Sequence, residues 1–217
     1  MSRALSPAKA RRVYDRVGAR QDAQAWYEDP AVDAMLRLGA ITEAERVVEM
    51  GCGTGRLAAR ILGAMPETAT YHGTDLSPVM VGLARERLAA FGDRATVHLV
   101  DGGPPDLAPG SCDRFVSTYV LDLLSNEDAR ATLAAAHRAL VPGGVLCLAG
   151  LAPGHTPLSR IVSAGWKAAW HLRPVLVGGC RPIALAPLVD GPRWEIVGHA
   201  RVAPWGVPSE ALVARRV

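Results

Sequence analysis

Short apolar runs alternate with amphipathic segments between about residues 45 and 150. Runs rich in β-branched and aromatic residues predict strands, which we expect to end at residue 50 and to span residues 70–75, 96–100, 112–120 and 144–149. Segments that begin at Arg56 and Ser125 have the spacing of helices that bury one face. This alternation is typical of an α/β protein with a doubly wound, mostly parallel sheet and helices on both faces.

Two further regions flank this alternating core. Before it, the pattern predicts helices from Pro7 to about Arg20 and from Pro30 to Gly39, with residues 21–29 as a link. After it, we expect a helix over 157–172, a short helix over 183–189, and strands over 194–203 and 211–217. We interpret the whole chain, 1–217, as one domain: a helical cap (1–44), a central core (45–150) and a C-terminal part (151–217).

Composition limits the classes of protein to consider. The chain has 217 residues and 49% hydrophobic content, which suits a globular domain, and its formal charge of +3 is too small to indicate a nucleic-acid partner. Four cysteines lie far apart and form no C-x-x-C pair, so we expect neither a zinc site nor a disulfide framework. We see no signal peptide and no membrane-spanning run, and therefore expect a cytoplasmic protein.

The most informative segment is the glycine-rich run from Val47 to Gly55. Glu49 ends an apolar strand, and three glycines follow at alternate positions before a helix: Gly51, Gly53 and Gly55. Glycines let the backbone turn tightly and let a ligand lie against main-chain atoms. A dinucleotide fingerprint would require a third glycine where Arg56 stands. A nicotinamide-dependent oxidoreductase therefore fits the spacing less well.

Acidic residues also end the next two predicted strands. Asp75 follows the second strand and precedes a helix, and a carboxylate there can accept hydrogen bonds from both hydroxyls of a ribose. Asp101 and Gly102 end the third strand, although Asp-Gly is also a common turn signal. Between these two acids lies a segment with the residues Leu76, Ser77 and Met80.

These motifs together resemble the class I methyltransferase superfamily, which uses S-adenosylmethionine. The acidic-x-G-x-G-x-G run, the D-L-S-x-x-M segment and the L-x-P-G-G turn at 140–144 occur in the family's order over roughly residues 45–150. Within the superfamily, the chain is most similar to small ubiquinone/menaquinone-biosynthesis and phospholipid N-methyltransferases. The resemblance implies a Rossmann-like sheet of seven strands, closed by an antiparallel pair formed by the last two.

The resemblance also implies a role for each motif in binding S-adenosylmethionine. Glu49 would balance the methionine ammonium, the loop of Gly51, Cys52, Gly53 and Gly55 would hold its carboxylate, and Asp75 would bind the ribose. Leu76, Ser77 and Met80 would pack near the adenine, and Asp101 with Gly102 would lie near its amino group. Tyr14, in a Y-D segment, would cover the cofactor as a lid, and Tyr119 would border the methyl group.

The acceptor side is less defined by sequence. Tyr119 and Asp122, just after the fourth strand, are the candidates to orient or deprotonate an acceptor. The helix over 157–172 carries an apolar stripe with cations opposite, which suits a membrane surface or packing on a sheet: Leu158, Ile161, Val162, Gly165, Trp166, Ala169 and Trp170.

We therefore expect a small, lipophilic acceptor such as a quinone-like molecule or a lipid headgroup, with peripheral membrane contact left open. Enzymes that methylate polar metabolites or macromolecules, and a non-catalytic binder of S-adenosylmethionine, are the alternatives. The identity of the acceptor and the oligomeric state do not follow from sequence.

Overall fold

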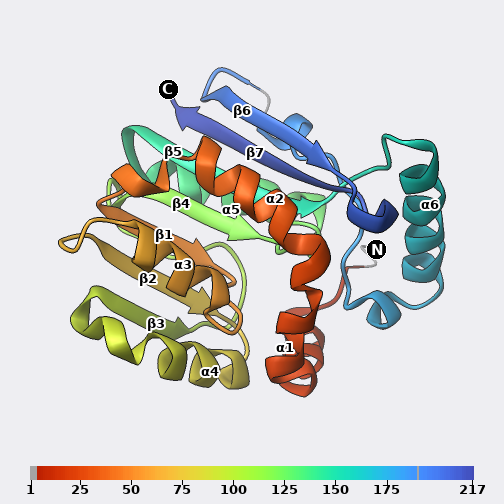
Figure 1. Ribbon diagram of the computed structural model, residues 1–217, viewed down its shortest axis with the longest axis horizontal. Coiled ribbons are helices and arrows are strands. Elements are labelled where there is room, and N and C mark those ends of the chain that lie inside the picture. Colours follow the sequence, from red (N-terminus) through yellow and green to blue (C-terminus); the bar gives the residue numbers. More distant parts are fainter. Residues whose placement is uncertain (1–3, 190) are drawn as a thin grey trace.

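One mixed, seven-stranded sheet organises the computed structural model, which describes residues 4–189 and 191–217 (Figure 1). The strand order is β3-β2-β1-β4-β5-β7-β6, and only the pairings of β7 with its two neighbours are antiparallel. This confirms the expected doubly wound fold and its closing antiparallel pair. The strands are β1 (Arg46–Met50), β2 (Thr70–Asp75), β3 (Ala95–Leu99), β4 (Cys112–Thr118), β5 (Leu140–Leu151), β6 (Trp194–Val202) and β7 (Ser209–Arg216).

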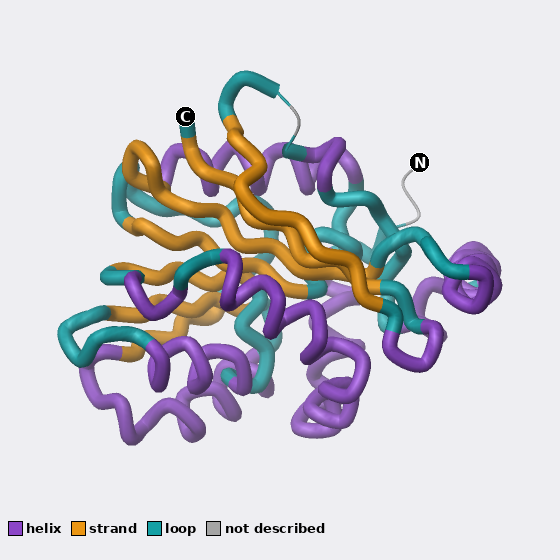
Figure 2. The backbone as a smooth tube through the Cα atoms, turned by 45° about the horizontal axis from the view of Figure 1, so that its top comes forward, coloured by secondary structure: helices purple, strands orange, loops and turns teal. Residues whose placement is uncertain are grey.

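Helices cover both faces of this sheet (Figure 2). The α-helices are α1 (Pro7–Val17), α2 (Ala25–Leu38), α3 (Arg56–Ala64), α4 (Pro78–Leu88), α5 (Asn126–Ala139) and α6 (Pro157–Leu172). Short 3₁₀ helices connect several elements: η1 (Gly18–Gln24), η2 (Ile41–Glu43), η3 (Ala89–Arg94), η4 (Pro174–Val177), η5 (Ala186–Leu188) and η6 (Pro204–Gly206). None of the described helices is long and apolar enough to cross a bilayer.

The central strands are apolar on both faces because helices cover both faces. Side chains alternate along a strand, so Val47 joins one core with α2 and α3, and Val48 joins the other with α5. The same alternation separates Val116 from Phe115 on β4. Two buried cores therefore hold the strands rigidly, and their carboxyl ends form a fixed edge.

That edge faces a second group of helices. In Figure 1 the arrowheads of β1, β2 and β4 point toward α1 and α6, which lie beyond the sheet rather than flat against it. Ligands of open α/β sheets bind in the crevice outside the carboxyl ends of the strands. The fold thus predicts where a site should lie.

Three expected boundaries were wrong. Helix α2 begins at Ala25, so residues 21–29 are helical rather than a link, and Pro30 lies inside the helix. Strand β5 begins at Leu140, and the L-x-P-G-G turn forms an irregularity within its pairing to β4. The short helix expected over 183–189 is reduced to η5, a single 3₁₀ turn.

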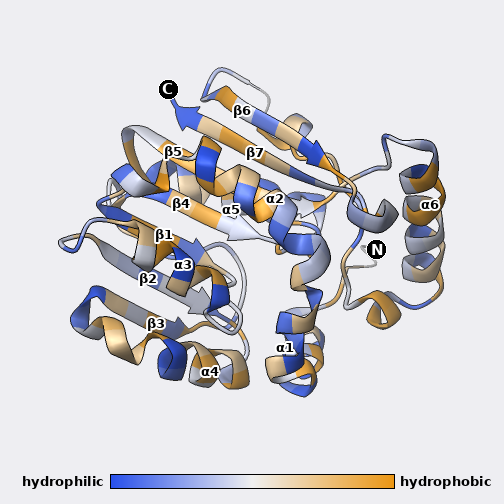
Figure 3. Ribbon diagram, in the orientation of Figure 1, coloured by the Kyte–Doolittle hydropathy of each residue, from blue (hydrophilic) through white to orange (hydrophobic). Residues whose placement is uncertain are grey.

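The apolar stripe of α6 divides between two environments. Val162, Trp166, Ala169 and Trp170 are half-buried or buried, and each indole N–H donates to a carbonyl of the following loop. Ile161, by contrast, is 71% exposed. Figure 3 shows the apolar colouring continuing from α6 into η4. Part of the stripe therefore packs inward, and part faces solvent.

Candidate functional site

A cavity of about 750 Å³ lies at the carboxyl edge of the sheet. Its floor comes from the ends of β1, β2 and β4 with the loops that follow them, and its walls come from α1, η1, the first turn of α2, α6 and η4. Few cavities of this size occur in one domain, and they are the usual places for small-molecule ligands. This cavity is therefore the candidate ligand site.

The glycine loop shapes the cavity floor. Gly51, Gly53 and Gly55 all have positive φ, which side chains adopt only with strain. The N–H groups of Gly51 and Cys52 donate to the carbonyl of Thr74, which ties the loop to β2. A Cβ at Gly53 would meet no protein atom within 4 Å, so this residue leaves open space on the cavity wall. Such a bare backbone surface is what a closely bound ligand requires.

Asp75 lies at the tip of β2 and joins the glycine loop. Its Oδ2 accepts a hydrogen bond from the Gly53 N–H at 3.0 Å, and its Oδ1 accepts one from the Ser77 N–H at 2.8 Å. A carboxylate can accept about four hydrogen bonds, so acceptor capacity remains for ligand hydroxyls. Burial raises the pKa of this carboxyl group, and the backbone N–H groups of Ser77, Gly53 and Leu76 oppose that rise.

Glu49 is the deepest acidic group of the cavity. Its side chain is 1% exposed, and its Oε2 accepts a hydrogen bond from the Tyr71 hydroxyl at 2.6 Å. Burial raises the pKa of Glu49 to about 7 despite this donor. A buried carboxylate with so little compensation favours a cationic ligand beside it.

The acidic residue expected after the third strand behaves differently from Glu49 and Asp75. Asp101 is exposed and pairs with Arg11 at 3.2 Å, and its side chain is not among those on the cavity wall. Gly102 does line the cavity, as do Leu76 and Met80. Ser77 is buried behind the wall, where its hydroxyl caps α4 and donates to Asp15 of α1 at 2.6 Å. Ser77 therefore positions α1 rather than facing a ligand.

Tyr14 covers the cavity from α1, as expected for a lid residue. Its hydroxyl lies 4.0 Å from the Sγ of Cys180, in the segment after η4. Both residues line the cavity, so this contact joins the N-terminal helix to the far wall.

Tyr119 and Asp122, expected on the acceptor side, are not equivalent. Tyr119 follows β4 with a φ of 54°, lines the cavity and donates to the hydroxyl of Ser209 at 3.1 Å. Asp122 is 1% exposed and lies behind the cavity wall, where its Oδ2 accepts from the Leu151 N–H. Burial raises the pKa of Asp122 to about 7. Its position outside the lining argues against direct contact with an acceptor.

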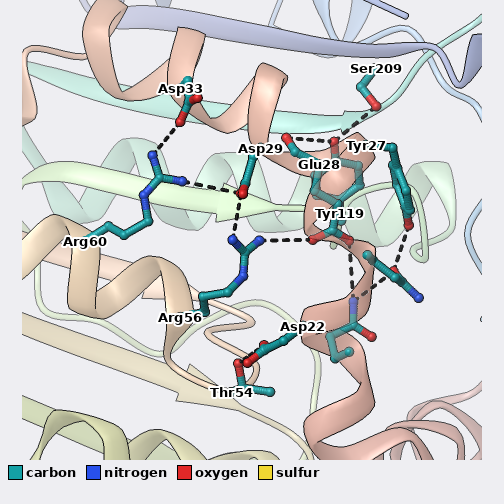
Figure 4. A network of polar contacts seen from close by, with 12 residues as sticks. Asp22, Tyr27, Glu28, Asp29, Asp33, Thr54, Arg56, Arg60, Tyr119 and Ser209 are labelled. Atoms are coloured by element: carbon teal, nitrogen blue, oxygen red, sulfur yellow. Dashed lines mark hydrogen bonds and ion pairs between the residues drawn. The ribbon is translucent and has the colours of Figure 1, made fainter. Parts of the chain in front are cut away.

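Sequence reasoning missed Glu28, a buried acidic residue on the cavity wall. It lies in the first turn of α2, next to Tyr27, and faces Arg56 of α3 (Figure 4). The expected helix start at Pro30 assigned the W-Y-E segment at 26–28 to a link. The signal was present, since apolar positions at 27, 31, 32, 34 and 35 already follow helical spacing.

Comparison with known proteins agrees with this geometry. A family model described as a methyltransferase domain matches residues 47–144. The chain is 34% identical over 186 residues to the release factor glutamine methyltransferase of Deinococcus radiodurans, covering 72% of this chain and 65% of the relative. It is 35% identical over 114 residues to the carboxy-S-adenosyl-L-methionine synthase of Chromohalobacter salexigens, covering 52% and 40%.

A solved structure agrees in fold. The N-methyltransferase NodS of Bradyrhizobium japonicum WM9, in complex with S-adenosyl-L-homocysteine, superimposes with a TM-score of 0.70 at 16% identity. The match covers 95% of this chain and 98% of that one. The family model and these relatives support the class I S-adenosylmethionine-dependent methyltransferase superfamily for this chain. S-adenosylmethionine is therefore the cofactor whose chemical groups can be compared with the cavity.

The residues on the cavity wall fit that cofactor. S-adenosylmethionine carries a sulfonium, an ammonium and a carboxylate, and so has a net positive charge. The cavity wall contains one arginine or lysine among the described residues, Arg56, and five carboxyl groups: Asp22, Glu28, Glu49, Asp75 and Asp106. An excess of acidic groups in a partly enclosed site concentrates a cationic ligand.

Proposed function

We propose that this protein transfers the methyl group of S-adenosylmethionine to a small, lipophilic acceptor. The observation that carries the proposal is the mixed lining of the cavity. Its wall combines the glycine loop, Glu49 and Asp75 with Tyr27, Trp166 and the apolar η4. The chain covers 40% and 65% of the two relatives' lengths, and their names describe different reactions, so the acceptor is argued from the cavity.

The chain's residues would hold the cofactor as follows. Asp75 binds the ribose hydroxyls, Glu49 balances the ammonium, and the Gly51–Gly55 loop with the N-terminus of α3 receives the carboxylate. Leu76, Met80 and Gly102 flank the adenine, and Tyr14 closes over the site. The bound cofactor supplies an electrophilic methyl group on sulfur.

Positioning is the main catalytic task of such a site. Holding two reactants in line can lower a barrier by roughly 7–11 kcal/mol in favourable cases. Here, two rigid cores fix the strand ends, and Tyr119 lies on the cavity wall directly after β4. Tyr14 and η4 keep water away from the reacting groups when the cavity is closed.

The outer surface beside the entrance supports a lipophilic acceptor and a contact with a membrane surface. Ile161, Leu172, Val175 and Leu176 are between 54% and 80% exposed. Arginine and lysine residues accompany them on α6 and just after it, and no aspartate or glutamate occurs from Ala129 to Val189. Exposed aliphatic groups with cations and no acids match the surface of an anionic bilayer.

Labelled methyl transfer tests this function. The protein is incubated with methyl-labelled S-adenosylmethionine and an extract of its source cells, and the products are partitioned between organic solvent and water. We expect label in the organic phase. Label only in water-soluble metabolites or in macromolecules would contradict the lipophilic acceptor, and no transfer despite cofactor binding would support a non-catalytic role.

A further inference from the structure

Glu28 is a buried carboxylate on the cavity wall whose ion pair with Arg56 is long. Its residue is 8% exposed. The Gln21 side-chain amide lies 3.4 Å from Oε1 and the Arg56 guanidinium lies 3.7 Å from Oε2, and the Tyr27 hydroxyl also stabilises the charged form. Arg56 makes its shorter contact, 2.7 Å, with Asp29 instead. A charge buried this way is costly unless a ligand completes its interactions.

Three electron-rich rings line the cavity beside this carboxylate. The Tyr27 ring centre lies 6.0 Å from that of Tyr119 and 6.5 Å from that of Trp166, with edge contacts between them. The Tyr119 hydroxyl points to the backbone carbonyl of Glu28 at 3.4 Å. Aromatic rings grouped around a carboxylate are suited to an ammonium group, which they attract through their negative faces.

The charge of the cavity wall around Glu28 disfavours an anionic acceptor. Arg56 is the one arginine or lysine on the described cavity wall, and two carboxylates already face it. Burial raises the pKa of Glu28 to about 7, which suits a group that takes up a proton near neutral pH. A carboxylate or phosphate placed here would meet Glu28 without a free cation to balance it.

We propose that Glu28, with Tyr27, Tyr119 and Trp166, forms an acceptor site for an aliphatic amine on an apolar body, and that Glu28 removes its proton. This inference rests on the proposed function. The ammonium gives one proton to the Glu28 carboxylate, which leaves a neutral amine with a free electron pair. That pair forms the nitrogen–carbon bond as the carbon–sulfur bond breaks, and the bonding electrons stay on sulfur.

Three probes with one apolar body and different heads test the inference. Phenethylamine, phenethyl alcohol and hydrocinnamate are titrated by calorimetry into the protein saturated with S-adenosyl-L-homocysteine. We compare wild type, Glu28→Gln and the control Asp33→Asn, which removes the same charge from the same helix outside the cavity wall. Affinity for S-adenosyl-L-homocysteine is measured for all three proteins first.

The wild type and Asp33→Asn should bind the amine at least roughly tenfold more tightly than the alcohol or the acid, and Glu28→Gln should lose this preference. The affinity for S-adenosyl-L-homocysteine should be the same in all three proteins. Equal binding of amine and alcohol by the wild type would overturn the inference even if the variant does not fold. A Glu28→Gln protein that loses only S-adenosyl-L-homocysteine would show that Glu28 merely orients Arg56. Failure of the wild type to bind S-adenosyl-L-homocysteine would instead overturn the proposed function.

Discussion

At the scale of single residues, neighbouring glycines in the loop serve different purposes. Gly55 has a φ of 75°, and a Cβ there would lie 2.9 Å from the Cα of Ala84 on α4. Gly55 is therefore needed for the close approach of α3 to α4. Gly53 also has a positive φ, of 53°, but an added Cβ would point into open space. Its value lies in the ligand surface that it leaves bare.

Alanine substitutions separate these two roles. Gly55→Ala should lower the free energy of unfolding by roughly 2–4 kcal/mol, because backbone strain and the contact with Ala84 add together. Gly53→Ala should cost about 1–2 kcal/mol from strain alone and should weaken S-adenosylmethionine binding. Urea denaturation and calorimetry measure the two effects. Equal losses of stability would show that the loop does not set the packing of α3.

The cavity residues predicted from sequence were those fixed by short-range geometry. Glu49, Gly53 and Asp75 follow directly from strands whose ends meet at one edge, and the structure places all three on the cavity wall. Asp101 has the same local sequence signal, but the loop after β3 turns its side chain toward Arg11 and solvent. Glu28 was missed because the helix was expected to begin at Pro30, although the apolar positions from residue 27 onward already have helical spacing.

At the scale of elements, strong periodicity predicted the strands and helices of the core. The predicted start of α2 was wrong, because burial of Tyr27 and Met35 against β5 and β7 extends this helix ahead of Pro30. Helix α6 was correctly placed, but its stripe could not be assigned to one environment. The loop from Gly178 to Cys180 covers only the part with Trp166 and Trp170.

The exposed part of α6 leads to a prediction about membranes. Vesicles that contain phosphatidylglycerol should co-sediment the protein at low salt, and vesicles of phosphatidylcholine alone should not, because the exposed face is apolar and cationic. Ile161→Glu should reduce binding several-fold through lost burial and added negative charge. Val217→Glu, which changes the charge equally at another exposed aliphatic residue, is the control. Equal binding of both vesicle types would argue against this surface.

At the scale of the whole molecule, three buried carboxyl groups share one property. Burial raises the pKa of Glu28, Glu49 and Asp122 to about 7, whereas carboxyl groups of an unfolded chain titrate near 4. Between these values the folded protein binds protons that the unfolded chain has released. The contribution of these groups to stability is therefore complete below about pH 4 and is lost as the pH rises through about 7.

This linkage predicts that the ligand-free protein loses stability between about pH 5 and pH 8. Urea denaturation at the two pH values measures the difference. Glu49→Gln should reduce it, because the amide cannot release a proton. A stability that instead rises over this range would contradict the assignment of raised pKa values.

We propose that the cavity at the strand ends binds S-adenosylmethionine through Asp75. Calorimetric titration of the cofactor into wild type, Asp75→Asn and Asp101→Asn tests it directly, because both acids follow strands of the same sheet and only Asp75 reaches the cavity. We expect Asp75→Asn to weaken binding at least roughly tenfold and Asp101→Asn to bind like the wild type. No binding by the wild type, or the same loss of affinity in both variants, would contradict cofactor binding through Asp75.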